Sequence, residues 1–100
     1  PDQVSQHTEC RLGQWYYGGE GRQCFSKLPG YRELESPHIE VHQMAIQALE
    51  ARARGDLLTM LKDVESMEKA SRAVVDHLQR MSDSAISDTS LLCFGADGLI

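Results

Sequence analysis

Long hydrophobic runs are missing from this 100-residue sequence. No apolar stretch approaches the ~20 residues that a helix needs to cross a bilayer. The first residues, PDQVSQHTE, are polar and acidic, which excludes a secretory signal peptide in this segment. We therefore expect a cytoplasmic location and no membrane contact by this segment.

An excess of positive charge is also lacking. Ten Lys and Arg residues face 15 Asp and Glu residues, which gives a formal net charge of -5. The basic residues are scattered, and Arg52 and Arg54 are the tightest pair. Binding to a nucleic-acid backbone requires a basic patch, so nucleic acid is excluded as a partner. The length allows a single domain at most.

Cysteine is scarce, with three residues at positions 10, 24 and 93. An odd number excludes a complete disulfide framework, and reduced thiols fit the cytoplasm. For Cys24 and Cys93 we expect the usual role of a free cysteine, that of a small buried hydrophobe. Cys10 differs because it opens the stretch CRLGQWYYGGEG, in which glycine and bulky aromatic residues follow the thiol closely.

The N-terminal third is rich in glycine and predicts loops rather than long elements. Residues 1–35 should form a cysteine- and aromatic-containing loop with a short helix near residues 9–17, which Gly18 and Gly19 would stop. At the other end, residues 87–100 indicate a linker or the start of a following domain.

Two long helices should occupy residues 36–86. Serine followed by proline at Pro37 predicts a helix start. Gly55 should end this helix, and Asp56 should cap a second helix that ends near residue 86. Apolar residues recur every three or four positions along this second helix, so it should pack against other helices. The tight turn makes the two helices antiparallel neighbours, and the predicted fold is an all-α antiparallel bundle.

His38 and His42 form the pattern HxxxH, which places both rings on one helix face. The same face continues through the apolar residues Ala45 and Leu49, so the rings should point into the bundle. Two inward imidazoles suit a tetrahedral zinc ion. The metalloprotease pattern HExxH is absent, and Glu40 faces away from the two rings. We therefore expect no enzyme activity, because the general base is missing.

CRLGQWYYGGEG followed by SPHIEVH resembles the bacterial chemoreceptor zinc-binding domain (CZB) family. The matching residues are Cys10, Gly13, Trp15, Tyr16, Pro37, His38 and His42. The resemblance covers about residues 7–80. It implies a four-helix bundle with a buried Zn²⁺ held by three histidines and one cysteine, and it assigns Cys10, His38 and His42 as zinc ligands.

Physical chemistry agrees with these motif positions. Gly13 would let the backbone turn tightly or approach another segment closely. Trp15 and Tyr16 would wall off the site and keep it dry. A thiolate binds zinc strongly, and mixed Cys and His ligands are common in closed sites.

One family ligand has no counterpart in this chain. The family's first ligand is a histidine on a preceding helix, so we expect a four-helix-bundle-like fold from which that helix is missing. The candidates for the fourth zinc ligand are His7, His77, water and another chain. The candidates for covering the exposed apolar face of the two long helices are the aromatic segment, a partner chain and an upstream helix.

The predicted function is a zinc-binding sensory or regulatory domain of a bacterial signalling protein of the chemoreceptor or diguanylate-cyclase type. Its response would be to metal and, through Cys10, to thiol oxidation. Partners would be a second copy of the chain, bound through helices, and the signalling domains of the parent protein. The alternatives are a metal-free helical dimerisation module and a zinc hydrolase with an open coordination position. The tail LLCFGADGLI is similar to the opening strand of a PAS domain.

Overall fold

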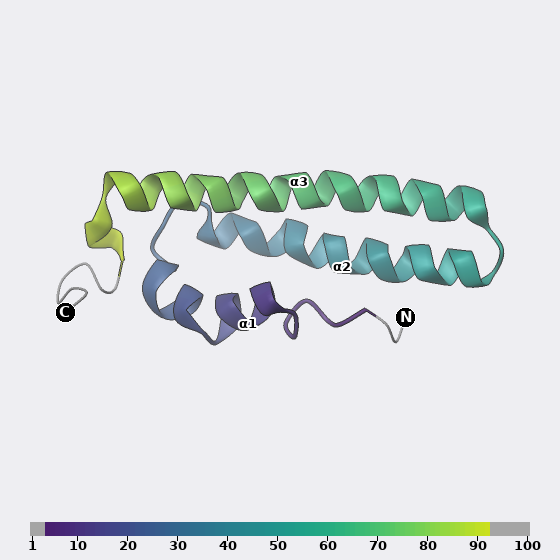
Figure 1. Cartoon of the computed structure of the whole chain (residues 1–100), viewed down its shortest axis with the longest axis horizontal. Coiled ribbons are helices and arrows are strands. Elements are labelled where there is room, and N and C mark those ends of the chain that lie inside the picture. The colour runs from purple at the N-terminus through teal and green to yellow at the C-terminus, as the bar shows by residue number, and fades with distance from the viewer. Residues whose placement is uncertain (1–3, 93–100) are drawn as a thin grey trace.

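The computed structural model describes residues 4–92 and contains helices joined by short connections (Figure 1). The elements, in chain order, are α1 (Arg11–Tyr17), a π-helical turn η1 (Gly21–Phe25), α2 (Tyr31–Ala53), α3 (Leu57–Ser87) and a 3-10 turn η2 (Thr89–Leu91). No strand occurs between residues 4 and 92. The predicted all-α class is therefore confirmed.

Helices α2 and α3 form an antiparallel hairpin and lie side by side along their length (Figure 1). Gly55 joins them with φ 77°, in the left-handed region that glycine enters without steric cost. The carboxylate of Asp56 then accepts a hydrogen bond from the Thr59 N–H at 3.1 Å and caps α3. The predicted break and cap are both confirmed.

Helix α2 begins earlier than its proline predicts. It starts at Tyr31, and Pro37 lies inside the helix, so the predicted start at Pro37 is wrong. The left-handed residue Gly30 precedes the helix, and its N–H donates to the Glu33 carboxylate at 3.2 Å. The extra turns bury Tyr31 and Leu34, whose removal from water outweighs the one backbone hydrogen bond that proline cannot donate.

The hydrophobic core joins α1, the start of α2 and the C-terminal half of α3. Its buried members are Tyr16, Leu28, Tyr31, Leu34, Val74, Met81 and Leu92. Trp15 and Phe25 pack against this cluster, with ring centroids 5.3 Å apart. The aromatic segment therefore covers one end of the hairpin, and it is one of the three candidates that the sequence suggested for this role.

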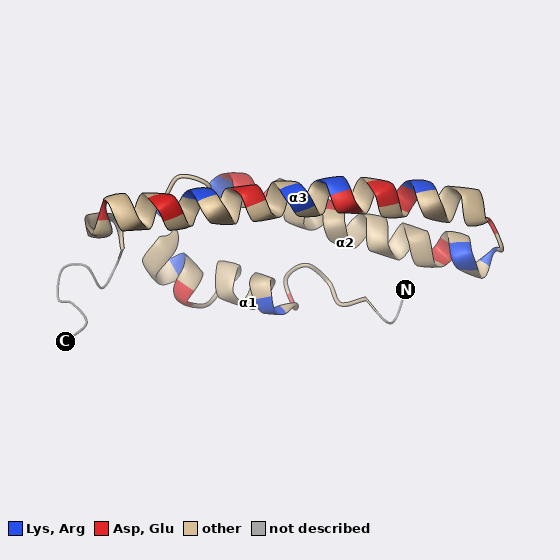
Figure 2. Ribbon diagram, turned by 45° about the horizontal axis from the view of Figure 1, so that its top comes forward, with Lys and Arg blue, Asp and Glu red and all other residues tan. Residues whose placement is uncertain are grey.

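The end of the hairpin next to the α2–α3 turn lacks this cover. Leu57, Leu58 and Leu61 at the start of α3 are 59–67% exposed. Farther along α3, acidic and basic residues are interspersed rather than gathered by sign (Figure 2). No described helix combines the length and the apolar character that crossing a membrane requires.

The cysteines have different environments. Cys10 is the free cysteine among the described residues. Cys24 is half-buried in η1, whereas the sequence predicts a buried residue. Cys93 and the rest of the PAS-like tail lie outside the described residues.

Candidate metal centre

Cys10 occupies the N-cap position of α1. Its Sγ accepts a hydrogen bond from the Gly13 N–H at 3.3 Å and lies 3.6 Å from the His7 carbonyl oxygen, to which the thiol donates. The sulfur thus takes the place that a serine or aspartate oxygen usually fills at a helix start. This role fixes the side chain at the end of α1 that faces α2.

Gly13 is required by the path of the segment before α1. A Cβ added at this position would meet the His7 carbonyl oxygen at 1.9 Å and the Thr8 carbonyl carbon at 2.8 Å. The expected close approach is confirmed, and its partner is the 7–8 backbone rather than another helix. The glycine therefore allows the segment before α1 to fold back against the first turn.

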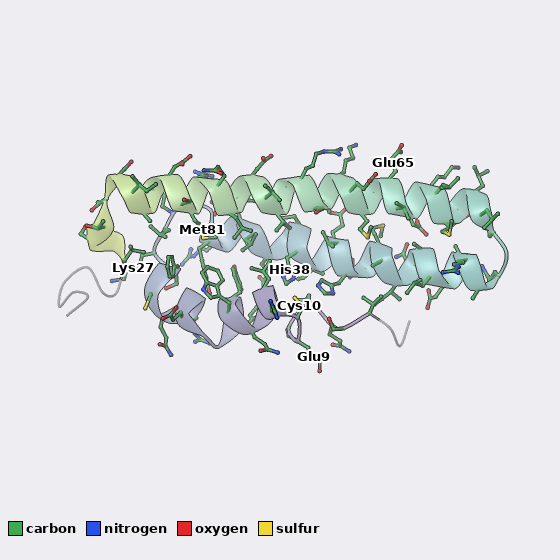
Figure 3. The ribbon with its side chains drawn as sticks, viewed as in Figure 1. Glu9, Cys10, Lys27, His38, Glu65 and Met81 are labelled. Atoms are coloured by element: carbon green, nitrogen blue, oxygen red, sulfur yellow. The ribbon has the colours of Figure 1, made fainter. Side chains whose placement is uncertain are left out.

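His38 and His42 leave the same face of α2, as their spacing predicts. Their ring centroids are 4.9 Å apart, and the planes are nearly perpendicular at 81°. His38 is buried, with 4% of its surface exposed. Its Nε2 lies 3.2 Å from the Cys10 Sγ, and Figure 3 shows the two residues facing each other from α2 and α1.

The three residues offer a convergent donor set. One ligand atom from each of Cys10, His38 and His42 lies within 4.8 Å of the other two. In a tetrahedral zinc site, with Zn–N and Zn–S distances of about 2.1 and 2.3 Å, neighbouring donors are roughly 3.3–3.6 Å apart. Small side-chain rotations would bring the three atoms to this spacing, so thiolate and imidazole donors fit a zinc ion here.

Neighbouring groups favour the protonation states that metal binding requires. The Nδ1 of His42 lies 2.7 Å from the Ser5 carbonyl oxygen, to which it donates in the neutral ring, and this leaves the lone pair on Nε2. Burial lowers the pKa of His38, and the positive charges that His42 and His7 can carry lower it further. Burial and these charges therefore favour the neutral His38 imidazole, which is the form that binds metals.

The two histidines outside this set lie in different places. The His7 ring centroid is 5.9 Å from that of His38 and 6.5 Å from that of His42. The backbone of His77, in contrast, lies against Gly30 at the start of α2. Of the two candidate histidines for the fourth position, only His7 is beside the site.

The aromatic residues of the motif do not act as the sequence predicts. Trp15 packs on Phe25, and Tyr16 stacks on Tyr31 in the core. The ring that contacts a histidine of this region is Tyr17, whose centroid is 5.7 Å from that of His7. No pattern in the sequence distinguishes Tyr17 from its neighbour for this role. Ser5, which orients His42, carries no signal either.

Comparison with known protein families places this geometry in context. Residues 1–49 match the model of the chemoreceptor zinc-binding domain (CZB), and the match includes Cys10, His38 and His42. Over these residues the chain is therefore similar to the chemoreceptor zinc-binding domain family. Searches of curated proteins and of solved structures returned no significant match.

Proposed function

We propose that this chain is a zinc-responsive sensory or regulatory domain of a bacterial signalling protein of the chemoreceptor or diguanylate-cyclase type. The observation that carries the proposal is the convergence of Cys10, His38 and His42 in a segment that matches the zinc-binding family. We place the domain in the cytoplasm, where the parent protein's output domains would receive its signal.

Zinc would be held by the Cys10 thiolate and the imidazoles of His38 and His42. Bound there, it would join the start of α1 to the middle of α2, in addition to the contacts between Tyr16 and Tyr31. Because α2 packs along α3, a change in the position of α2 would be transmitted to this long helix. Helix α3 would pass it to a downstream domain or across a homodimer formed through the helices.

Cys10 gives the site a second input. Its sulfur is half-buried rather than fully enclosed. Hydrogen peroxide would transfer one oxygen atom to Sγ, which converts the thiol to a sulfenic acid while the peroxide is reduced to water. The oxidised sulfur is a weaker zinc ligand than the thiolate, so oxidation would loosen the link between α1 and α2.

Metal analysis of the purified protein, combined with thermal melting, tests the proposal. We expect about one zinc per chain and a lower melting temperature after chelation, because zinc at about 100 times its dissociation constant stabilises the fold by about 2.7 kcal/mol. A protein that binds no zinc, and whose melting temperature and oligomeric state ignore a chelator, would instead be a metal-free dimerisation module.

We infer no enzyme activity. The residue that follows His38 is Ile39, and Glu40 is exposed whereas His38 is buried, so the glutamate that serves as general base in HExxH enzymes is missing. Chelator-sensitive turnover of model esters or peptides would favour a zinc hydrolase and contradict this inference.

A further inference from the structure

Residues 4–9 run from the start of α1 back along α2 and lie against the metal centre. In Figure 1 this segment passes beside α2 toward the α2–α3 turn. Every third side chain turns inward: Val4, His7 and Cys10 are half-buried, whereas the residues between them are exposed. We propose that residues 4–9 form a strap that controls access to the Cys10 sulfur and the His42 ring. This inference rests on the proposed zinc function of the site.

The backbone of the strap is hydrogen-bonded to two of the three residues of the metal centre. The Ser5 carbonyl oxygen accepts from the Nδ1 of His42 at 2.7 Å. The His7 carbonyl oxygen accepts from the Cys10 thiol at 3.6 Å. Both donor side chains are therefore covered on one side by strap backbone, and a molecule that approaches from that side reaches them only when the strap moves away.

The His7 ring fills the middle of the inner face of the strap. It meets the Tyr17 ring edge to face, with centroids 5.7 Å apart, and its centroid is 5.9 Å from that of His38 and 6.5 Å from that of His42. The Tyr17 hydroxyl donates to the Glu35 carboxylate at 2.8 Å, which holds the tyrosine against α2. His7 covers the site by packing, and this role requires no bond to the metal.

The two ends of the strap are held in different ways. At the α1 end, the Gln6 carbonyl oxygen accepts from the Glu9 N–H at 2.9 Å and from the Cys10 N–H at 3.3 Å. At the other end, Val4 lines an apolar groove between α2 and α3. The hydrogen-bonded turn would act as the pivot, and the Val4 end would be the end that opens.

The groove provides the apolar contact that keeps the strap closed. Its walls include Ala45 and Leu49 of α2 and Met60 and Val64 of α3. Removal of the Val4 side chain from water stabilises the closed strap only modestly, because this side chain is half-buried. The strap can therefore open without unfolding of either long helix. Because the groove is built from α2 and α3 together, a change in their packing would alter access to the metal centre.

The test measures access to Cys10 in the variant Val4→Asp, which places a charge in the apolar groove. Zinc-free protein is pulse-labelled with N-ethylmaleimide, and mass spectrometry gives the labelling rate of Cys10 separately from that of the other cysteines. Release of zinc from the loaded protein into a chromophoric chelator gives a second rate. We expect both rates to rise about tenfold, because the strap is open for more of the time.

The matched control is Val75→Asp, which adds the same charge at a valine of α3 that is 58% exposed. Both of its rates should equal those of the parent. If Val4→Asp does not fold, Val4→Ala is the second variant, and its smaller loss of apolar contact should raise both rates about threefold.

Unchanged rates in the Val4 variants overturn this inference but leave the proposed zinc function standing. Equal increases in Val4→Asp and Val75→Asp also overturn it, because they indicate general loosening of the fold. If the parent binds no zinc while Cys10 still labels faster in the Val4 variants alone, the strap is confirmed as a cover of the thiol and the proposed function is overturned.

Discussion

The side chains of Tyr16 and Tyr31 hydrogen-bond each other's backbone. The Tyr16 hydroxyl donates to the Tyr31 carbonyl oxygen at 2.6 Å, and the Tyr31 hydroxyl donates to the Tyr16 carbonyl oxygen. The two rings stack with their centroids 4.1 Å apart and their planes 10° from parallel. Both side chains are buried. This reciprocal pair fastens α1 to the first residues of α2 without a metal.

The tyrosine pair also sets the register of the metal centre. Helices α1 and α2 run in opposite directions (Figure 1). Cys10 precedes Tyr16 by six residues and His38 follows Tyr31 by seven, which at 1.5 Å per residue is about 9 Å and about 10.5 Å along the two helices. The near equality of these distances brings the sulfur opposite the imidazole.

Replacing Cys10 with serine should separate helix capping from metal binding. Serine is among the preferred N-cap residues, so its hydroxyl should accept the Gly13 N–H that Sγ accepts now. We expect the chelated variant to unfold within about 0.5 kcal/mol of the chelated parent. Zinc should bind the variant more than about 100-fold more weakly, because a hydroxyl is a poor zinc ligand.

Chemical denaturation with and without zinc checks this prediction. His77→Ala provides the control for an ordinary substitution in the same fold. If Cys10→Ser keeps the parent's zinc-dependent stabilisation, the sulfur is not a ligand.

Gly13→Ala should destabilise the protein and weaken zinc binding together. The added Cβ would overlap the His7 carbonyl oxygen, so the segment before α1 must move away. We expect a loss of about 1–3 kcal/mol in the free energy of unfolding, although alanine is normally the better helix former.

Gly18→Ala is the matched control, because an added Cβ there meets nothing within 4 Å. Urea unfolding of the chelated proteins gives the stability change, and chelator competition gives the affinity. Equal stability of Gly13→Ala and the parent would show that the segment before α1 packs differently.

Alkaline pH should weaken the junction between α1 and α2. Burial, with Tyr31 as the next largest cause, raises the pKa of Tyr16 from its ordinary 10.0 to about 12. Since the unfolded chain loses this proton near pH 10, the stabilisation from the neutral hydroxyl is fully present below pH 10 and is lost as the pH rises through about 12.

Unfolding of the parent and of Tyr16→Phe at a series of pH values checks this dependence. The phenylalanine variant should be less stable below pH 10, and the difference between the two proteins should shrink toward pH 12. A difference that stays constant over this interval would show that the Tyr16 hydroxyl titrates normally.

Local signals in the sequence predict part of this fold. Gly55 and Asp56 mark the end of one helix and the start of the next, because both act on the backbone next to them. Pro37 fails as a signal for the opposite reason. The start of α2 is decided by the burial of Tyr31 and Leu34 against α3 and α1, which a local pattern does not contain.

The candidate site, too, can be predicted from the sequence only in part. The HxxxH spacing alone places His38 and His42 on one face. The meeting of Cys10 with His38 joins positions 28 residues apart, so only the family resemblance indicated it. The location of His7 depends on the backbone crossing that Gly13 permits, and no spacing rule reports such a crossing.

The uneven cover of the α2–α3 hairpin has a consequence for how the molecule opens. Near Gly55 the two helices pack only against each other, and the leucines at the start of α3 are exposed. Fraying should therefore begin there, and amide hydrogens should exchange fastest there. Near Tyr31 and Met81 the aromatic cluster binds three elements into one cooperative unit. A change at Cys10 should therefore affect the C-terminal end of α3 before it affects the Gly55 end.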